Sequence, residues 1–189
     1  NGVTINGNRN LIFANKINVK STGVLVKGNY NVKLKNTITC NSLGISVKGH
    51  SNNVDRNNIT SNATGLKSIG HKNKFTSNKV KSKVNGIVSH GNQNFFSKNT
   101  VSGNKKYGLQ SAGHNNKISK NIANKNKNHG IKVNGDKNKV SGNFARLCGV
   151  HGIKIAGDRN AVTGNKLGKN VNKRICVYGY RNSVKKNKK

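Results

Sequence analysis

The chain has 189 residues, of which 36 are lysine or arginine and only 3 are acidic, so its formal net charge is +33. Asparagine occurs 37 times and glycine 22 times, whereas glutamate, proline, methionine and tryptophan are absent. No stretch approaches the roughly 20 consecutive apolar residues of a membrane-spanning helix. Since carboxylates are so scarce, the composition also argues against most acid/base enzymes and metal sites.

An internal repeat organises the whole chain. Pairs of glycines five residues apart, beginning with Gly2 and Gly7, recur every 21 residues in the first four copies and every 22 in the next four. A ninth copy has Arg174 in place of its first glycine. If that first glycine is position 0, positions 1, 3, 10 and 15 are mostly apolar. Lys33 interrupts position 10.

The apolar residues alternate with polar ones in runs of three to five, which predicts short β-strands around positions 1, 10 and 15 of each copy. Glycine and asparagine between the runs predict bends, because both tolerate positive φ. A unit this small buries its apolar face only when it stacks on copies of itself. We therefore expect a single domain, residues 1–189, in which about nine coils stack at about 4.8 Å per coil.

Two positions are asparagine in every copy. Side-chain amides stacked one coil apart can bond each other along the axis, so we expect these residues to hold the bends. They are Asn10, Asn31, Asn52, Asn73, Asn94, Asn116, Asn138, Asn160 and Asn182 at position 8, and Asn15, Asn36, Asn57, Asn78, Asn99, Asn121, Asn143, Asn165 and Asn187 at position 13.

The repeat G-h-x-h-x-G-x-x-N-x-h-x-x-N-x-h, in which h is apolar, resembles that of the pectin-lyase-like superfamily over residues 2–189. The resemblance implies an all-β fold, a right-handed parallel β-helix. The superfamily includes polysaccharide lyases, hydrolases, periplasmic proteins and viral tailspikes, so the resemblance is specific for fold and not for activity. Members with enzymatic activity use clustered acids or acidic calcium ligands, and this chain matches no enzyme subfamily.

The one catalytic constellation that the sequence offers is a pair of aspartates. Asp136 and Asp158 both occupy position 6, in adjacent coils, so their side chains are expected to be axial neighbours. Stacked carboxylates can serve acid/base chemistry. Position 6 follows a glycine bend, however, and Lys137 and Arg159 are obvious ion-pair partners. No third acid supports the pair. We therefore predict no enzymatic activity.

The sequence predicts no metal and no cofactor. His50 and His71 share position 6 and could stack, but two imidazoles without a third ligand make a poor metal site. Cys40, Cys148 and Cys176 fall at three different positions, which argues against a disulfide framework and favours a reducing compartment.

The charge is the main pointer to a partner. Nine coils measure roughly 40 Å, and duplex DNA of that length carries about 24 phosphate charges. The net charge of +33 exceeds this number. The codon bias of an AT-rich genome would account for much of the lysine, but it accounts poorly for the absence of glutamate. Lysine outnumbers arginine 30 to 6, which favours phosphate contact without base readout. The expected nucleic-acid-binding residues are Arg9, Lys35, Arg56, Lys72, Lys98, Lys120, Lys137, Arg159 and Arg181.

The sequence thus favours a structural protein that binds nucleic acid non-specifically and condenses a genome, in a virion or another compartment rich in nucleic acid. One alternative is a carbohydrate-binding or carbohydrate-active β-helix that acts on an anionic polysaccharide. Another is a purely structural coat or spike protein. The open coil ends and partly apolar residues on the first sheet also suggest a homo-oligomer.

Overall fold

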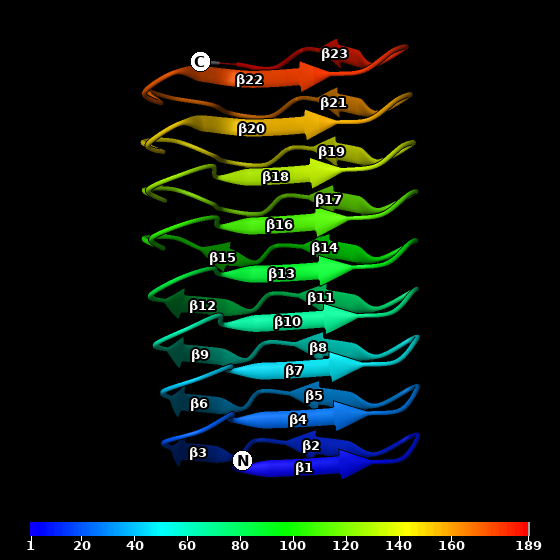
Figure 1. The fold of residues 1–189 in the computed structure, drawn as a ribbon, viewed down its shortest axis with the longest axis vertical. Helices are drawn as coiled ribbons and strands as arrows, with labels where there is room; N and C mark the ends of the chain where they lie inside the picture. The colour runs from blue at the N-terminus through cyan, green and yellow to red at the C-terminus, as the bar shows by residue number, and fades with distance from the viewer. Residues whose placement is uncertain (189) are drawn as a thin grey trace.

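The structure, a computed structural model, describes residues 1–188 as one solenoid of stacked coils (Figure 1). Each coil begins with a strand of the first sheet, whose nine members pair in parallel and in chain order. These strands are β1 (Val3–Asn6), β4 (Val24–Lys27), β7 (Ile45–Lys48), β10 (Leu66–Ile69), β13 (Ile87–His90), β16 (Leu109–Ala112), β18 (Ile131–Asn134), β20 (His151–Ala156) and β22 (Lys173–Tyr178).

The second sheet also has nine parallel strands, one from each coil. They are β2 (Leu11–Phe13), β5 (Val32–Leu34), β8 (Asn53–Asp55), β11 (Lys74–Thr76), β14 (Phe95–Ser97), β17 (Lys117–Ser119), β19 (Lys139–Ser141), β21 (Ala161–Thr163) and β23 (Ser183–Lys185). The predicted parallel β-helix of about nine coils is therefore confirmed. No helix long and apolar enough to cross a membrane occurs in residues 1–188.

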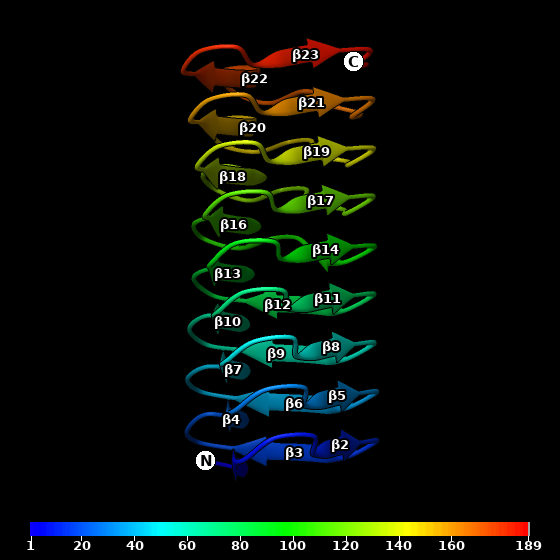
Figure 2. The ribbon, with the colours of Figure 1, turned by 90° about the vertical axis from the view of Figure 1, so that its right-hand side faces the viewer.

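The third sheet is shorter and lies only in the N-terminal coils (Figure 2). It contains β3 (Lys16–Val19), β6 (Thr37–Cys40), β9 (Asn58–Ser61), β12 (Lys79–Ser82) and β15 (Thr100–Val101). Beyond it, single bridges continue the column from Thr100 to Ile122 and Phe144. The change coincides with the switch from 21 to 22 residues per coil. The extra residue falls between Val101 and Gly108, on this third side, so it loosens this side while the other two sheets keep their register.

Like positions stack on like positions throughout the core. Strand pairing places Leu66 beside Ile87 and Phe75 beside Phe96, whose rings stack with centroids 5.0 Å apart. Positions 1, 10 and 15 are buried through most of the solenoid, as the sequence predicts. Lys33 keeps the register of its column and is fully buried in the core, so the interruption seen in the sequence is a lysine inside the protein.

The two asparagine columns share one hydrogen bond to the backbone and differ in the bonds between their side-chain amides. At position 13 the amides bond each other along the axis, as predicted: each Nδ2 donates to the Oδ1 of the next coil at 2.8–3.1 Å. At position 8 only Asn10 and Asn31 make this amide–amide bond. In both columns, Oδ1 also accepts the backbone N–H of the asparagine in the preceding coil, at 2.7–3.0 Å.

Candidate functional site: a groove along the first bend

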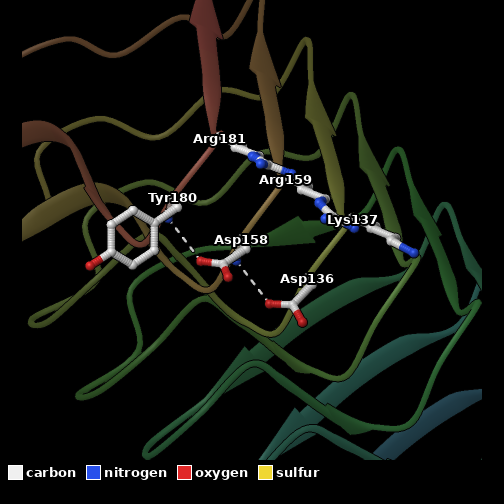
Figure 3. Close-up of a pocket in the computed structure, with 6 residues that line it drawn as sticks. All are labelled: Asp136, Lys137, Asp158, Arg159, Tyr180 and Arg181. Atoms are coloured by element: carbon white, nitrogen blue, oxygen red, sulfur yellow. Dashed lines mark hydrogen bonds between the residues drawn. The ribbon is translucent and has the colours of Figure 1, made fainter.

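A shallow groove of about 660 Å³ lies where β18, β20 and β22 end and the chain bends toward the second sheet. Positions 6 and 7 of three adjacent coils form two parallel rows (Figure 3). We call this site the cationic groove; it is lined by Asp136, Asp158 and Tyr180 in one row and by Lys137, Arg159 and Arg181 in the other.

The row at position 6 belongs to a hydrogen-bonded ladder that runs the length of the solenoid. In each of its eight steps the side chain accepts the backbone N–H of position 6 in the next coil, at 2.7–3.1 Å. The acceptors are Oδ1 of asparagine or aspartate and Nδ1 of histidine. We call this column the position-6 ladder; it comprises Asn8, Asn29, His50, His71, Asn92, His114, Asp136, Asp158 and Tyr180.

The ladder explains how the two aspartates are held. Oδ1 of Asp136 accepts the N–H of Asp158, and Oδ1 of Asp158 accepts the N–H of Tyr180, both at 2.8 Å (Figure 3). The two residues are thus axial neighbours, as the sequence predicts. A carboxylate has a second oxygen, and Oδ2 of Asp136 lies 3.3 Å from Nδ1 of His114. Because that Nδ1 accepts the N–H of Asp136, it does not also donate to Oδ2, and the two atoms are in contact without a hydrogen bond between them.

The expected ion pairs of these aspartates with Lys137 and Arg159 are not formed. Among residues 1–188, the only pair between an aspartate and a lysine or arginine is Arg56–Asp55, at 3.4 Å. The cations of the groove therefore remain available to a ligand.

The residues at position 7 of this groove are exposed and share an unusual backbone conformation. Lys137, Arg159 and Arg181 have φ of 54–56°, in the left-handed region that residues other than glycine seldom adopt. All nine residues predicted to bind nucleic acid share this conformation. The structure nevertheless divides them between two bends. Position 7 carries Arg9, Lys72, Lys137, Arg159 and Arg181, and position 12, beyond the second sheet, carries Lys35, Arg56, Lys98 and Lys120. Only three of the nine line the cationic groove.

One cluster was not recognised as a unit from the sequence. Where the chain enters the first sheet, the rings of His129 and His151 stack with centroids 5.0 Å apart, and Tyr107 stacks on His129 at 5.6 Å. Burial, together with nearby Lys154 and Lys132, lowers the pKa of His129 to about 4. The three rings all precede a position-0 glycine, and this shared position is the signal that could have revealed the stack. In residues 1–188, no group of three or more histidine, cysteine or acidic side chains that could hold a metal ion occurs.

Residues 43–188 match the protein family described as "Right handed beta helix region". The chain belongs to this right-handed β-helix family. No curated protein matches the sequence. Among solved structures, the periplasmic alginate epimerase AlgG superposes with a TM-score of 0.76 at 18% identity, over 88% of this chain and 49% of the epimerase. A point mutant of the same epimerase gives 0.78 at 17% identity, over 92% of this chain and 50% of the mutant.

These comparisons correct two functional predictions for this right-handed β-helix protein. The prediction of a nucleic-acid-binding protein without enzymatic activity is contradicted. The solved structures that resemble this chain are alginate epimerases, which are enzymes that act on a carbohydrate. Nothing in the family or in these structures supports DNA binding or a virion. At such low identity the likeness shows the fold alone, and the chain spans only about half of each epimerase. The charge was misleading because it indicates the sign of a partner and not its chemical class.

Proposed function

We propose that the protein is a carbohydrate-active β-helix that acts on an anionic polysaccharide in the cationic groove. The observation that carries the proposal is that a row of cations and a pair of carboxylates lie side by side in one open groove. Lys137, Arg159 and Arg181 provide one cation per coil, beside Asp136 and Asp158, which are not paired with them.

The row of cations suits a polymer with repeated carboxylates. Coils repeat at about 4.8 Å, so a chain laid along the groove meets a new cation at each coil. Arginine binds carboxylates through two parallel N–H···O bonds, and lysine adds a point charge. Tyr180, which is 81% exposed, offers an aromatic face to a sugar ring.

The aspartates are the candidates for chemistry. Each uses Oδ1 to hold the ladder, which leaves Oδ2 to exchange a proton with the ligand. The reaction class that fits is proton exchange at the sugar carbon next to the carboxylate: Oδ2 would accept the proton from carbon, the electron pair of the C–H bond would delocalise onto the sugar carboxylate, and a proton returned from water to the opposite face would invert that carbon. The adjacent cations would stabilise the negative charge that develops on that carboxylate. The likeness to alginate epimerases supports alginate as the first polymer to test.

Arg159→Gln is expected to weaken binding of an alginate oligosaccharide about 10- to 150-fold, since a hydrogen bond to a charged group contributes about 1.5–3 kcal/mol. Titration calorimetry at one fixed salt concentration measures the change. Arg146→Gln is the matched control, because Arg146 is exposed and lies outside the groove. Equal weakening by both variants, or equal binding of neutral dextran, would contradict recognition in the groove.

Asp158→Asn is expected to abolish turnover of alginate while the protein still folds and binds. Asparagine preserves the ladder oxygen, as Asn92 does in the same column, but it lacks a titratable group. Proton NMR of alginate incubated with each protein follows the reaction, and an unfolding curve confirms the fold. Alginate left unchanged by the wild type, or turnover retained by Asp158→Asn, would show that Asp158 has no catalytic role.

A further inference from the structure

A second hollow, of about 470 Å³, lies along the same bend nearer the N-terminus. It too is built from positions 6 and 7, so the position-6 ladder passes continuously from this hollow to the cationic groove. We call it the imidazole hollow; it is lined by Tyr30, His50, Ser51, His71, Lys72, Asn92, Gln93 and Asn115.

The ladder sets the tautomer of both imidazoles in this hollow. Nδ1 of His50 accepts the N–H of His71, and Nδ1 of His71 accepts the N–H of Asn92, at 3.1 and 3.0 Å. In neutral histidine the proton must then be on Nε2. The rings stack with centroids 5.1 Å apart and planes 2° apart, and both residues are exposed. The hollow therefore presents two N–H donors, one coil apart, and no free imidazole nitrogen to ligate a metal.

The wall of the imidazole hollow differs from that of the cationic groove. Where the groove has three successive cations, this wall has Tyr30, Ser51, Lys72, Gln93 and Asn115. Tyr30 is 60% exposed. Hydroxyl and amide groups both donate and accept hydrogen bonds, which suits sugar hydroxyls better than carboxylates.

We propose that the imidazole hollow is a second saccharide-binding site, which takes the hydroxyl-bearing face of the same polysaccharide that the cationic groove holds. This inference rests on the proposed function and extends it to a longer footprint. His71 and Asp136 are three coils apart in the ladder, or about 14 Å at about 4.8 Å per coil. A short oligosaccharide fills the cationic groove alone, and only a longer one reaches both sites.

The test is the affinity of alginate oligosaccharides of graded length, from trisaccharide to dodecasaccharide, for the wild type and the double variant His50→Asn, His71→Asn. Asparagine replaces the imidazoles without breaking the ladder, because Asn8, Asn29 and Asn92 fill the same column with the same bond. We expect the double variant to bind the longest oligosaccharides about tenfold more weakly. Its affinity for the shortest is expected to equal that of the wild type.

His90→Asn is the control, because His90 is exposed on the first sheet and lies outside both sites. It is expected to leave all affinities unchanged, and the unfolding midpoints of both proteins are compared with the wild type. A double variant that weakens short and long oligosaccharides equally, or neither, overturns the second site alone. If the wild type binds no oligosaccharide of any length, the proposed function falls and the second site falls with it.

Discussion

Lys33→Met is expected to stabilise the protein by about 4 kcal/mol at pH 7. Lys33 is fully buried, and burial lowers the pKa of its ammonium group from 10.5 to about 7. Each unit of such a shift corresponds to about 1.4 kcal/mol of free energy that disfavours the charged form in the folded state. Methionine keeps the unbranched shape without the charge, and a core tolerates swaps of similar volume.

The substitution leaves no hydrogen-bond acceptor without a partner. Nζ of Lys33 donates to the carbonyl of Asn31 at 3.2 Å and to Oδ1 of Asn52 at 3.4 Å. That carbonyl also accepts the N–H of Asn53, and that Oδ1 also accepts the N–H of Asn31, each at 2.9 Å. The usual penalty for removing one partner of a buried hydrogen bond is therefore small at this site.

The pH dependence tests the cause of the stabilisation. Between pH 7 and pH 10.5 the unfolded state binds more protons at Lys33 than the folded state does. The wild type therefore gains stability as the pH rises through this range, and below pH 7 the penalty is fully present. The difference between Lys33→Met and the wild type should shrink from pH 7 to pH 10.5. Urea unfolding at several pH values measures it.

Lys74→Met is the matched control, because Lys74 lies on β11 of the same sheet and is exposed. Its effect is expected to stay within about 0.5 kcal/mol, as for other surface substitutions. Equal effects of the two substitutions would mean that the Lys33 ammonium reaches water.

Lys33 also shows what hydropathy alone leaves undetermined. The repeat predicts that position 10 points inward, whereas lysine ordinarily points outward. The repeat determines the direction of the Lys33 side chain, because a slip of one residue in the strand register would turn every side chain of β5 to the opposite face. Val32, Lys33 and Leu34 pair in register with Asn53, Val54 and Asp55. One misplaced lysine costs less free energy than the loss of a whole pair of stacked strands.

The site was less predictable than the fold, for a physical reason. Asparagine, histidine and aspartate at position 6 share an acceptor atom at the same distance from the backbone, and this common property holds the ladder. The sequence predicts that these side chains are axial neighbours. Only the coil geometry shows that each of them accepts the backbone N–H of position 6 in the next coil. The absence of ion pairs between these aspartates and Lys137 or Arg159 is likewise visible only in the structure, because Arg56, with the same left-handed backbone, does pair with Asp55. Side-chain direction, rather than composition, creates the groove.

Gly70→Ala is expected to destabilise the protein by about 3–5 kcal/mol, because strain and overpacking each cost about 1–3 kcal/mol. Gly70 occupies position 5, immediately before the position-6 ladder, with φ of +138°. A Cβ there would overlap the backbone carbonyl of Gly49 in the preceding coil. Because that carbonyl belongs to the stacked backbone, it has little freedom to move aside.

Gly164→Ala is the comparison for a glycine in the left-handed helical region that has no close neighbour. Gly164 has φ of +62°, and a Cβ there would contact nothing within 4 Å. Ala14 already occupies the equivalent position of the first coil with φ of 54°, so this substitution is expected to cost only about 1–2 kcal/mol. Thermal unfolding of both variants makes the comparison. If Gly70→Ala were as mild as Gly164→Ala, the coils could separate enough to admit a methyl group, and the glycine column would not set the spacing on which the ladder and the groove depend.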